Sequence, residues 1–333
     1  MENHNKTIIF CQACVDVCYT LQIIKERGES NCIIFVIHVE NLYAFFTSLK
    51  LSVIDIIFIP MPYLSLKKPY KTKNEINNIW KTFFQKFEDC IIYFFSLSYD
   101  YLTASMVTRL SSKKTNDVYY YCYCEDFLNN PQKTFSVKMR LYGLLYKYIT
   151  GVHFVTNVKL GFPNFNISKY NIKKIEISDK PETESRFLYK MEQNTDKTKG
   201  NVLFFISTDE EDLLTEKSIK KLEDILLCIR EKGFTLALKG HPRIGEPANL
   251  LHNFDKIIPS YIPSEFMDYS TFKYIIGFGS TALCFPAQHK YTTVISLLDI
   301  VEFSDKELQQ RLKELIISFS DNTILFKFPE FSI

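Results

Sequence analysis

The sequence lacks the glycine-rich motifs that most often identify a nucleotide-binding sheet. No G-x-G-x-x-G follows the first predicted strand, and no G-x-x-x-x-G-K-[ST] occurs anywhere, so the usual dinucleotide and P-loop interpretations have no motif. No apolar run reaches the roughly 20 residues that span a bilayer. The start, MENHNKTIIFCQA, does not read as a signal peptide. A net charge of +2 argues against a dedicated nucleic-acid binder held by phosphate neutralisation. We therefore expect a cytoplasmic protein that does not bind nucleic acid.

The cysteines do not form a recognisable metal or disulfide pattern. There are nine, an odd number in a long chain, which favours free thiols in a reducing compartment. Cys11, Cys14 and Cys18 invite a zinc interpretation, but no second Cys pair or His pair completes the ligand set. Helical spacing places Cys14 and Cys18 on one face of a helix, so buried thiols are the better interpretation. We predict no metal site and no resident cofactor.

Near-continuous apolar strands alternate with helices in the front half of the chain. This pattern predicts a parallel sheet covered on both faces. Strands are predicted at 6–13, 31–38, 55–61, 89–97, 117–124 and 171–177, and helices at 15–28, 41–50, 74–87, 104–112 and 136–150.

The alternation stops in a polar stretch and then starts again. Residues 181–200 carry Pro181 and Gly200 and are predicted to be an interdomain linker. We predict an N-terminal Rossmann-like domain over 1–180, on the acceptor side, and a C-terminal nucleotide-sugar domain over 201–333. Two doubly wound domains facing a central cleft constitute the GT-B arrangement, with ligands outside the carboxyl ends of the strands. The second half is predicted to have strands at 201–207, 234–240, 256–260, 273–279 and 292–298, helices at 280–289 and 304–319, and a loop followed by a helix over 208–233.

A predicted strand in the second half ends on two cations and a histidine. The stretch FTLALKGHPR runs into Lys239, His241 and Arg243, with Pro242 fixing the backbone beside the histidine. Such a strand end can hold an anion, and an imidazole titrates close enough to neutrality to donate a proton to a leaving phosphate. The alternative is an ordinary surface-loop histidine.

Two further stretches of the second half could bind a nucleotide. In FGSTAL, Gly279 ends a strand and Ser280-Thr281 begin a predicted helix, whose hydroxyls and free amides could hold a phosphate; ordinary N-capping by Ser280 is the alternative. In IPSE, Glu265 could accept hydrogen bonds from a ribose diol. A capping box that uses Ser264 is the alternative there.

Acidic residues follow a predicted strand in the front half. In YCYCEDFLNN, Glu125 and Asp126 come at the strand's carboxyl end, where a carboxylate could act as general base on a sugar hydroxyl. A solvated loop or a helix start is the alternative. The acidic cluster at 209–212 is interpreted as the first turn of a helix, where carboxylates are favoured in any case.

Taken together, these motifs resemble those of bacterial sialyltransferases, which carry a D/E-D/E-G motif, an HP motif and a later S-S/T motif. They occur here in the family's order, as EDF at 125–127, GHP at 240–242 and ST at 280–281, and IPSE is similar to the family's ribose-binding turn. One position departs from the pattern. Phe127 stands where the family has glycine, and phenylalanine resists a turn with positive φ.

The resemblance implies a reaction and a role for each motif. It implies inverting, metal-independent transfer of sialic acid from CMP-sialic acid to a galactose-terminated acceptor of a surface polysaccharide, with the α2,3 linkage favoured. Asp126 or Glu125 would be the base, and His241 would assist departure of the phosphate. The residues implied in CMP binding are Lys239, Gly240, Pro242, Glu265, Gly279, Ser280 and Thr281.

Other interpretations remain open at this point. The basic stretches 67–75 and 111–116 could touch an anionic inner membrane and a lipid-linked acceptor, or could simply be solvated loops. A GT-B transferase that uses another CMP- or UDP-activated sugar is the nearest alternative. A non-catalytic GT-B-shaped scaffold in polysaccharide assembly is the more distant one, and Phe127 favours it.

Overall fold

The chain divides into two compact units, an N-terminal unit over Met1–Glu182 and a C-terminal unit over Thr183–Ile333. Each is described here by itself. The computed structural model describes residues 6–51, 55–60, 67–95, 100–122, 137–152, 154–157, 162–165, 167–177, 181–191, 200–242, 244–288, 292–320 and 323–328.

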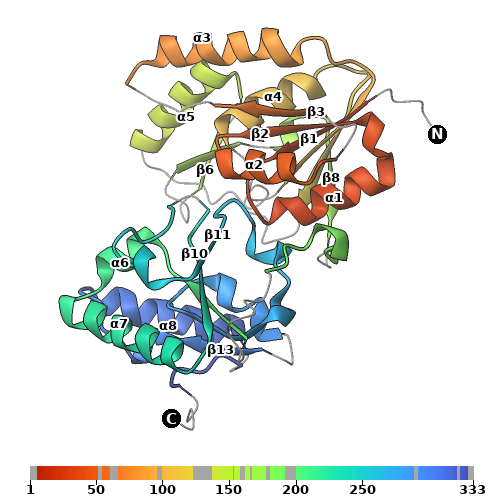
Figure 1. The fold of residues 1–333 in the computed structure, drawn as a ribbon. Coiled ribbons are helices and arrows are strands. Elements are labelled where there is room, and N and C mark those ends of the chain that lie inside the picture. Colours follow the sequence, from red (N-terminus) through yellow and green to blue (C-terminus); the bar gives the residue numbers. More distant parts are fainter. Residues whose placement is uncertain are drawn as a thin grey trace. The chain divides into compact units, whose positions relative to one another are not determined.

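The N-terminal unit is built on a six-stranded parallel sheet (Figure 1). Its strand order is β3-β2-β1-β4-β5-β8, and every neighbouring pair runs parallel. The fully buried β2 and β4 explain the near-continuous apolar runs in the sequence. The strands are β1 (Lys6–Cys11), β2 (Cys32–Ile37), β3 (Asp55–Ile59), β4 (Cys90–Phe95), β5 (Asp117–Cys122) and β8 (Ile172–Glu176).

Helices cover both faces of this sheet. Two lie on one face, α1 (Asp16–Arg27) and α2 (Glu40–Ser48), and three on the other, α3 (Pro69–Ile79), α4 (Tyr101–Ser111) and α5 (Val137–Thr150) (Figure 1). Helix α3 begins earlier than predicted because Pro69 suits the first helical position, and it continues into a π-helical turn, η2 (Trp80–Phe84). A short antiparallel pair, β6 (Phe154–Asn157) and β7 (Phe162–Phe165), was not predicted.

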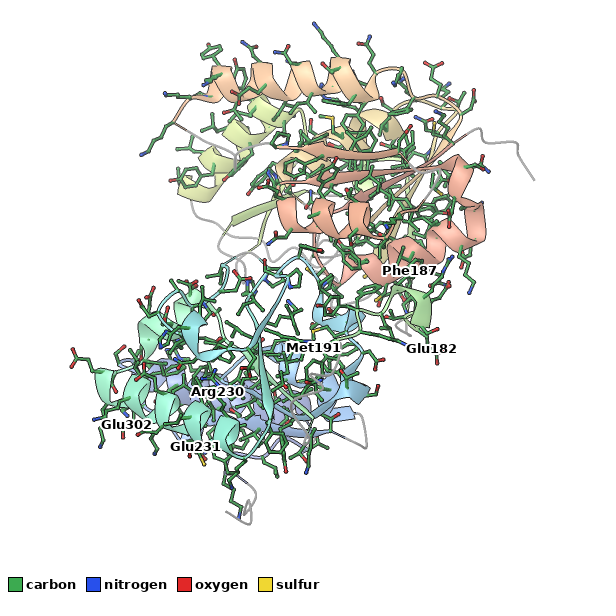
Figure 2. The ribbon with its side chains drawn as sticks, viewed as in Figure 1. Glu182, Phe187, Met191, Arg230, Glu231 and Glu302 are labelled. Carbon is green, nitrogen blue, oxygen red and sulfur yellow. The ribbon has the colours of Figure 1, made fainter. Side chains whose placement is uncertain are left out.

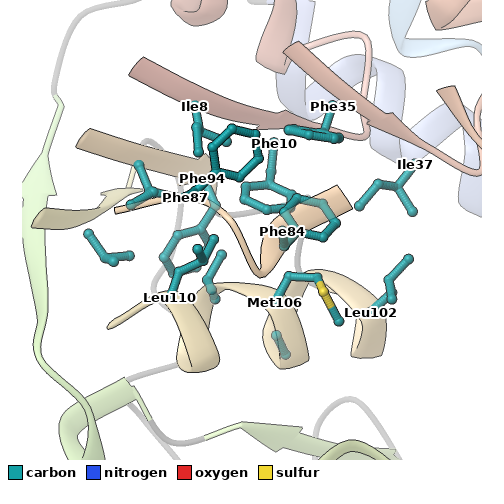
Figure 3. Packing of buried hydrophobic residues seen from close by; sticks show 14 of the residues in the cluster. Ile8, Phe10, Phe35, Ile37, Phe84, Phe87, Phe94, Leu102, Met106 and Leu110 are labelled. Atoms are coloured by element: carbon teal, nitrogen blue, oxygen red, sulfur yellow. The ribbon is translucent and has the colours of Figure 1, made fainter. Parts of the chain in front are cut away.

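Aromatic residues fill the core between the sheet and α4. Phe10 and Phe35 project from neighbouring strands onto Phe84 of η2, with ring centroids 5.4 and 4.5 Å from that of Phe84 (Figure 3). Met106 and Leu110 of α4 close the same cluster. Burial of these large rings fixes the sheet that carries the strand ends discussed below.

The C-terminal unit has a five-stranded parallel sheet in the order β11-β10-β9-β12-β13. If the strands of each unit are numbered along the chain, this order is 3-2-1-4-5. The five strands β3-β2-β1-β4-β5 of the N-terminal sheet have the same order. In each unit the order reverses beside the first strand, between β1 and β4 and between β9 and β12. The strands are β9 (Asn201–Phe205), β10 (Thr235–Lys239), β11 (Lys256–Ile258), β12 (Phe272–Gly277) and β13 (Thr293–Ser296).

The described part of the C-terminal unit has three α-helices. The stretch 208–233, predicted as a loop and a helix, forms two helices, α6 (Thr208–Leu213) and α7 (Glu216–Glu231), and α8 (Lys306–Ser320) follows the sheet. The break occurs because Ser207 caps α6 with a full capping box and Thr215 caps α7 separately. The acidic residues at 209–211 occupy the first turn of α6, as predicted.

Residues 183–191, inside the predicted linker, pair with the C-terminal unit. Tyr189 forms a parallel bridge with Met267, and Met191 is buried (Figure 2). The fold class predicted from the sequence, two Rossmann-like doubly wound α/β domains in tandem as in GT-B proteins, is confirmed by the two sheets.

Candidate functional site

The carboxyl ends of β10, β9 and β12 lie at one edge of the C-terminal sheet. Register places Lys239 and Gly277 on either side of Phe205. Since neighbouring strands lie about 4.8 Å apart, Lys239 and Gly277 are separated by roughly 10 Å. The residues that follow them, including His241 and Ser280, therefore begin at the same edge.

Lys239 is a buried cation that binds backbone at this edge. Its Nζ donates to the carbonyl oxygens of Gly240 and Ser260, at 3.3 and 3.4 Å. A buried ammonium needs such acceptors to offset its lost hydration. Its positive charge is held beneath the strand end, where it adds to the local potential.

The loop after β10 closes tightly and leaves His241 exposed. The backbone N–H of His241 donates to the carbonyl of Gly245 at 3.1 Å, and the Gly245 N–H donates back at 2.9 Å. Gly245 has a φ of +92°, a conformation that favours glycine. A Cβ on Gly240 would lie 2.6 Å from the Gly245 oxygen. Both glycines are thus required to present His241, with Pro242 beside it; Arg243 lies outside the described residues.

A threonine at the start of α6 holds this loop. The Thr208 hydroxyl lies within hydrogen-bond distance of the carbonyl oxygens of Ile244 and Glu246, at 3.3 and 2.9 Å. Further along, Glu211 Oε1 accepts from the backbone N–H of Asn249 at 3.1 Å. The histidine loop is therefore held by α6 and does not depend on its own turn alone.

Glu210 links the residues that follow β9 and β12, the two strands between which the order of the C-terminal sheet reverses. Its carboxylate accepts from the backbone N–H of Ser207 at 2.9 Å and lies 3.1 Å from the Ser207 hydroxyl. It also accepts from the backbone N–H of Gly279. Burial raises the pKa of Glu210, although these donors oppose the shift. The carboxylate therefore positions Gly279 and the following Ser280 at the switch point of the sheet.

A pH-dependent stability is expected from Glu210. Because its pKa is raised, the folded protein holds this proton more tightly than the unfolded chain does. This contribution is fully present below the ordinary pKa of glutamate and is lost as pH rises through the raised value. We expect the free energy of unfolding of wild type, relative to Glu210→Gln, to fall from acidic to neutral pH. Urea unfolding of both proteins at a series of pH values, with hydrogen exchange in β9 and β12, measures this difference in the free energy of unfolding.

The control for this experiment is Asp212→Asn. This variant removes an exposed carboxylate from the same helix, α6. A wild-type minus Glu210→Gln difference that stays constant or rises with pH would contradict the assignment.

The helix predicted over 280–289 is wrong. The structure has two short 3-10 turns there, η8 (Thr281–Leu283) and η9 (Pro286–Gln288). Ser280 Oγ accepts from the backbone N–H of Ala282 at 3.2 Å, so the capping alternative is formed locally. A 3-10 turn this short supplies no aligned helix dipole. Any phosphate contact here therefore rests on local amides and hydroxyls; the Thr281 side chain lies outside the described part.

Gly279 is required for close packing as well as for its N–H. A Cβ at this position would lie 2.8 Å from Cβ of Leu312 on α8. The chain after β12 thus passes directly against α8, which leaves room for no side chain before Ser280.

Glu265 lies on a braced turn after β11. It belongs to the 3-10 turn η6 (Ser264–Phe266), where Ser264 makes no capping bond, so the capping-box alternative is not formed. The Ser264 hydroxyl is 3.0 Å from Glu265 Oε2, and the buried Tyr269 hydroxyl donates to the Ser264 carbonyl at 2.7 Å. Burial, and then the Glu265 charge, raise the pKa of Tyr269, which therefore stays a neutral donor.

The predicted base residues of the N-terminal unit, Glu125 and Asp126, lie outside the described residues. The strand that precedes them, β5, ends at Cys122 in the described structure, between β4 and β8. Their role stays a prediction.

The structure reveals a polar cluster that sequence reasoning missed. Gln12 follows β1 and donates from Nε2 to the side chains of Asp100 and Thr103 near the start of α4. Asp100 also caps α4, because its Oδ1 accepts from the Thr103 N–H at 2.6 Å. These bonds join the ends of β1 and β4, where the N-terminal sheet reverses its order.

His38 joins the same cluster from the end of β2. Its Nε2 lies 3.0 Å from Asp100 Oδ2, and its backbone has a φ of +67°, which is uncommon outside glycine. The sequence did contain one indication that Asp100 begins a helix. Asp100 followed by Thr103 is an N-cap pattern, but the helix was predicted to begin only at 104.

The described cysteines are free thiols, as predicted, and several are buried. Burial raises the pKa of Cys32 and of Cys90 to about 11, so both stay protonated at neutral pH. Within the described residues, no group of three or more His, Cys, Asp or Glu side chains could hold a metal ion. Metal-independent catalysis remains a prediction.

Comparisons with known proteins find similar structures but no similar sequence family. No protein-family model and no curated protein matches the chain. The structure of the S. aureus MnaA–UDP complex aligns over 94% of this chain and 88% of its own, at 12% identity and a TM-score of 0.43.

Two further structures align at similar levels. UDP-GlcNAc 2-epimerase from Neisseria meningitidis, bound to UDP-GlcNAc, covers 95% of this chain and 90% of its own, at 11% identity and a TM-score of 0.38. The glycotransferase of kitacinnamycin covers 97% and 92%, at 7% identity and a TM-score of 0.46.

Proposed function

We propose that this protein is an inverting glycosyltransferase that transfers sialic acid from CMP-sialic acid to a galactose-terminated acceptor of a bacterial surface polysaccharide. The observation that carries the proposal is the edge of the C-terminal sheet. There, an exposed histidine on a glycine-closed loop follows β10, and a serine follows β12 at the switch point, so both start from the same end of the sheet with β9 between them. Three motifs in the family's order, at 125–127, 240–242 and 280–281, support the choice of sugar.

Each group at this edge suits one part of the leaving nucleotide. The amides and hydroxyls around Ser280 suit the single phosphate of CMP, and Lys239 adds positive potential below it. Glu265 is placed on its own turn, where a carboxylate suits the two ribose hydroxyls. Gly240 and Pro242 form the loop that presents His241.

We infer the following reaction. Asp126 or Glu125 takes the proton from the acceptor hydroxyl, whose oxygen forms the new bond to the anomeric carbon of the sugar. The bond from that carbon to the phosphate oxygen breaks, and its electron pair stays on the phosphate. His241 donates a proton or a hydrogen bond to this oxygen as CMP departs.

The first experiment is release of CMP from CMP-sialic acid, with and without a galactose-terminated oligosaccharide, in the presence of EDTA. We expect acceptor-dependent release that EDTA does not diminish, and competition by CMP that is stronger than competition by UMP or UDP. CMP binding without release would indicate a different sugar on the same nucleotide. Stronger competition by UDP would favour a UDP-sugar transferase. Neither release nor binding of any of these nucleotides would contradict the enzymatic proposal and favour a scaffold.

A further inference from the structure

One face of α5 carries apolar side chains that are unusually exposed. Val137, Leu141, Leu144 and Tyr148 have exposed fractions of 71, 62, 64 and 41%. Their spacing of four, three and four residues places them on one side of the helix. Tyr70 of α3 is 73% exposed. Tyr70, Val137, Leu141 and Leu144 are the most exposed large apolar residues in the described chain. We call these five residues the α3/α5 face.

The α3/α5 face is continuous between its two helices. The rings of Tyr70 and Tyr148 meet edge to face, with centroids 5.8 Å apart. Lys73 Nζ lies 4.1 Å from the centre of the Tyr148 ring. Figure 1 shows α3 and α5 on the same side of the N-terminal sheet. The apolar residues are thus held on a packed surface and do not belong to a loose end of the chain.

Positive charge surrounds the α3/α5 face. Residues 67–79 contain four lysines and one glutamate, a net charge of +3. Residues 137–150 contain two lysines, one arginine and no acid, also +3. Lys71 is exposed, and the single acid, Glu75, lies 3.9 Å from its Nζ. Within 67–79 and 137–150, the described cations that are exposed or lie over the Tyr148 ring are Lys67, Lys68, Lys71, Lys73 and Lys147.

This combination selects one class of partner. Contiguous exposed apolar side chains mark an interaction surface. The centres of protein–protein interfaces are depleted in lysine, whereas a helix with an apolar face flanked by lysines is typical of binding in the plane of a membrane. Anionic lipid headgroups attract such lysines. No helix in the described part of the chain is long and apolar enough to cross a bilayer.

We propose that the α3/α5 face docks this protein on the surface of a membrane that contains anionic lipids. The apolar side of α5 enters the boundary between headgroups and acyl chains, and the lysines of α3 and α5 contact the headgroup phosphates. The proposal does not depend on the proposed function, because it rests on the exposure and charge of these two helices alone.

The test is co-sedimentation of the full chain with lipid vesicles. We expect binding to vesicles of phosphatidylcholine with phosphatidylglycerol, and much weaker binding to phosphatidylcholine alone or at high salt. Leu141→Gln combined with Leu144→Gln should weaken partitioning by about tenfold or more, because two leucines no longer enter the lipid. Lys71→Glu combined with Lys73→Glu should weaken it on anionic vesicles specifically.

The matched control is Leu227→Gln on α7, which removes a leucine of comparable exposure, 53%, from the C-terminal unit. Its partitioning should equal that of wild type, and melting curves check that every variant folds. Wild type that fails to bind anionic vesicles, or binding that both double variants leave unchanged, would overturn the proposal. A concentration-dependent dimer that the leucine variants abolish, without vesicle binding, would assign the face to a second copy of the chain.

Discussion

Replacing His241 with alanine should lower kcat/KM for acceptor-dependent CMP release by about 100-fold or more, the range expected for loss of a general acid. The loop that carries His241 is held by backbone bonds to Gly245 and by Thr208, so the substitution removes the ring and leaves its support. CMP affinity should therefore change only a few-fold. Steady-state kinetics, together with CMP titration, separates the two effects.

Two variants sharpen this prediction. His241→Asn retains a hydrogen-bond donor but cannot give up a proton, so its activity should fall nearly as far as that of alanine. His252→Ala, an exposed histidine of the same unit, should behave as wild type. An alanine variant at 241 that keeps more than a tenth of the activity would exclude His241 as the acid.

Gly240→Ala should both destabilise the protein and weaken nucleotide binding. The new Cβ would lie 2.6 Å from the Gly245 oxygen and 2.8 Å from the Gly245 carbonyl carbon, and backbone atoms cannot swing aside as a side chain can. Overpacking of this kind costs about 1–3 kcal/mol. Since relief requires the 240–246 loop to move, His241 should be displaced and CMP should bind more weakly. Urea unfolding and CMP titration measure the two effects.

The control is Gly143→Ala on α5, where an added Cβ meets nothing within 4 Å. A glycine inside a helix is destabilising, so alanine at 143 should raise the free energy of unfolding by roughly 0.5–1 kcal/mol. Opposite signs at the two positions would support the steric account. Unchanged stability and CMP affinity in Gly240→Ala would show that the loop adapts without cost.

Most of the fold could be predicted because its signals are local. Apolar runs such as 31–38 and 89–97 correspond to β2 and β4, and the restart at 201 corresponds to β9. The sequence indicated a loop and one helix over 208–233, and the separate helix α6 was missed although Ser207 is an ordinary capping residue, because six residues are too few to show a helical period. The β6-β7 pair and the 3-10 turns after Ser280 have no periodic pattern long enough to detect.

The candidate site also contains some residues that the sequence indicated and others that it did not. The sequence pointed to His241, Ser280 and Glu265, because each follows a strand whose carboxyl end is a probable ligand edge. It did not point to Glu210, which looked like any acid in a first helical turn. The bond to Gly279 that gives Glu210 its importance joins residues far apart in the chain.

Local patterns along the chain specify the alternation of strands and helices, the division into two α/β domains and the order of the three motifs. These depend on periodicity and on residues next to one another. Only the tertiary structure decided that Gln12, His38 and Asp100 meet at the end of the N-terminal sheet. It also decided that Gly240 has no room for a Cβ and that one side of α5 remains exposed. Each of these depends on which strands become neighbours and what packs against a helix, and this is fixed by burial of the two cores.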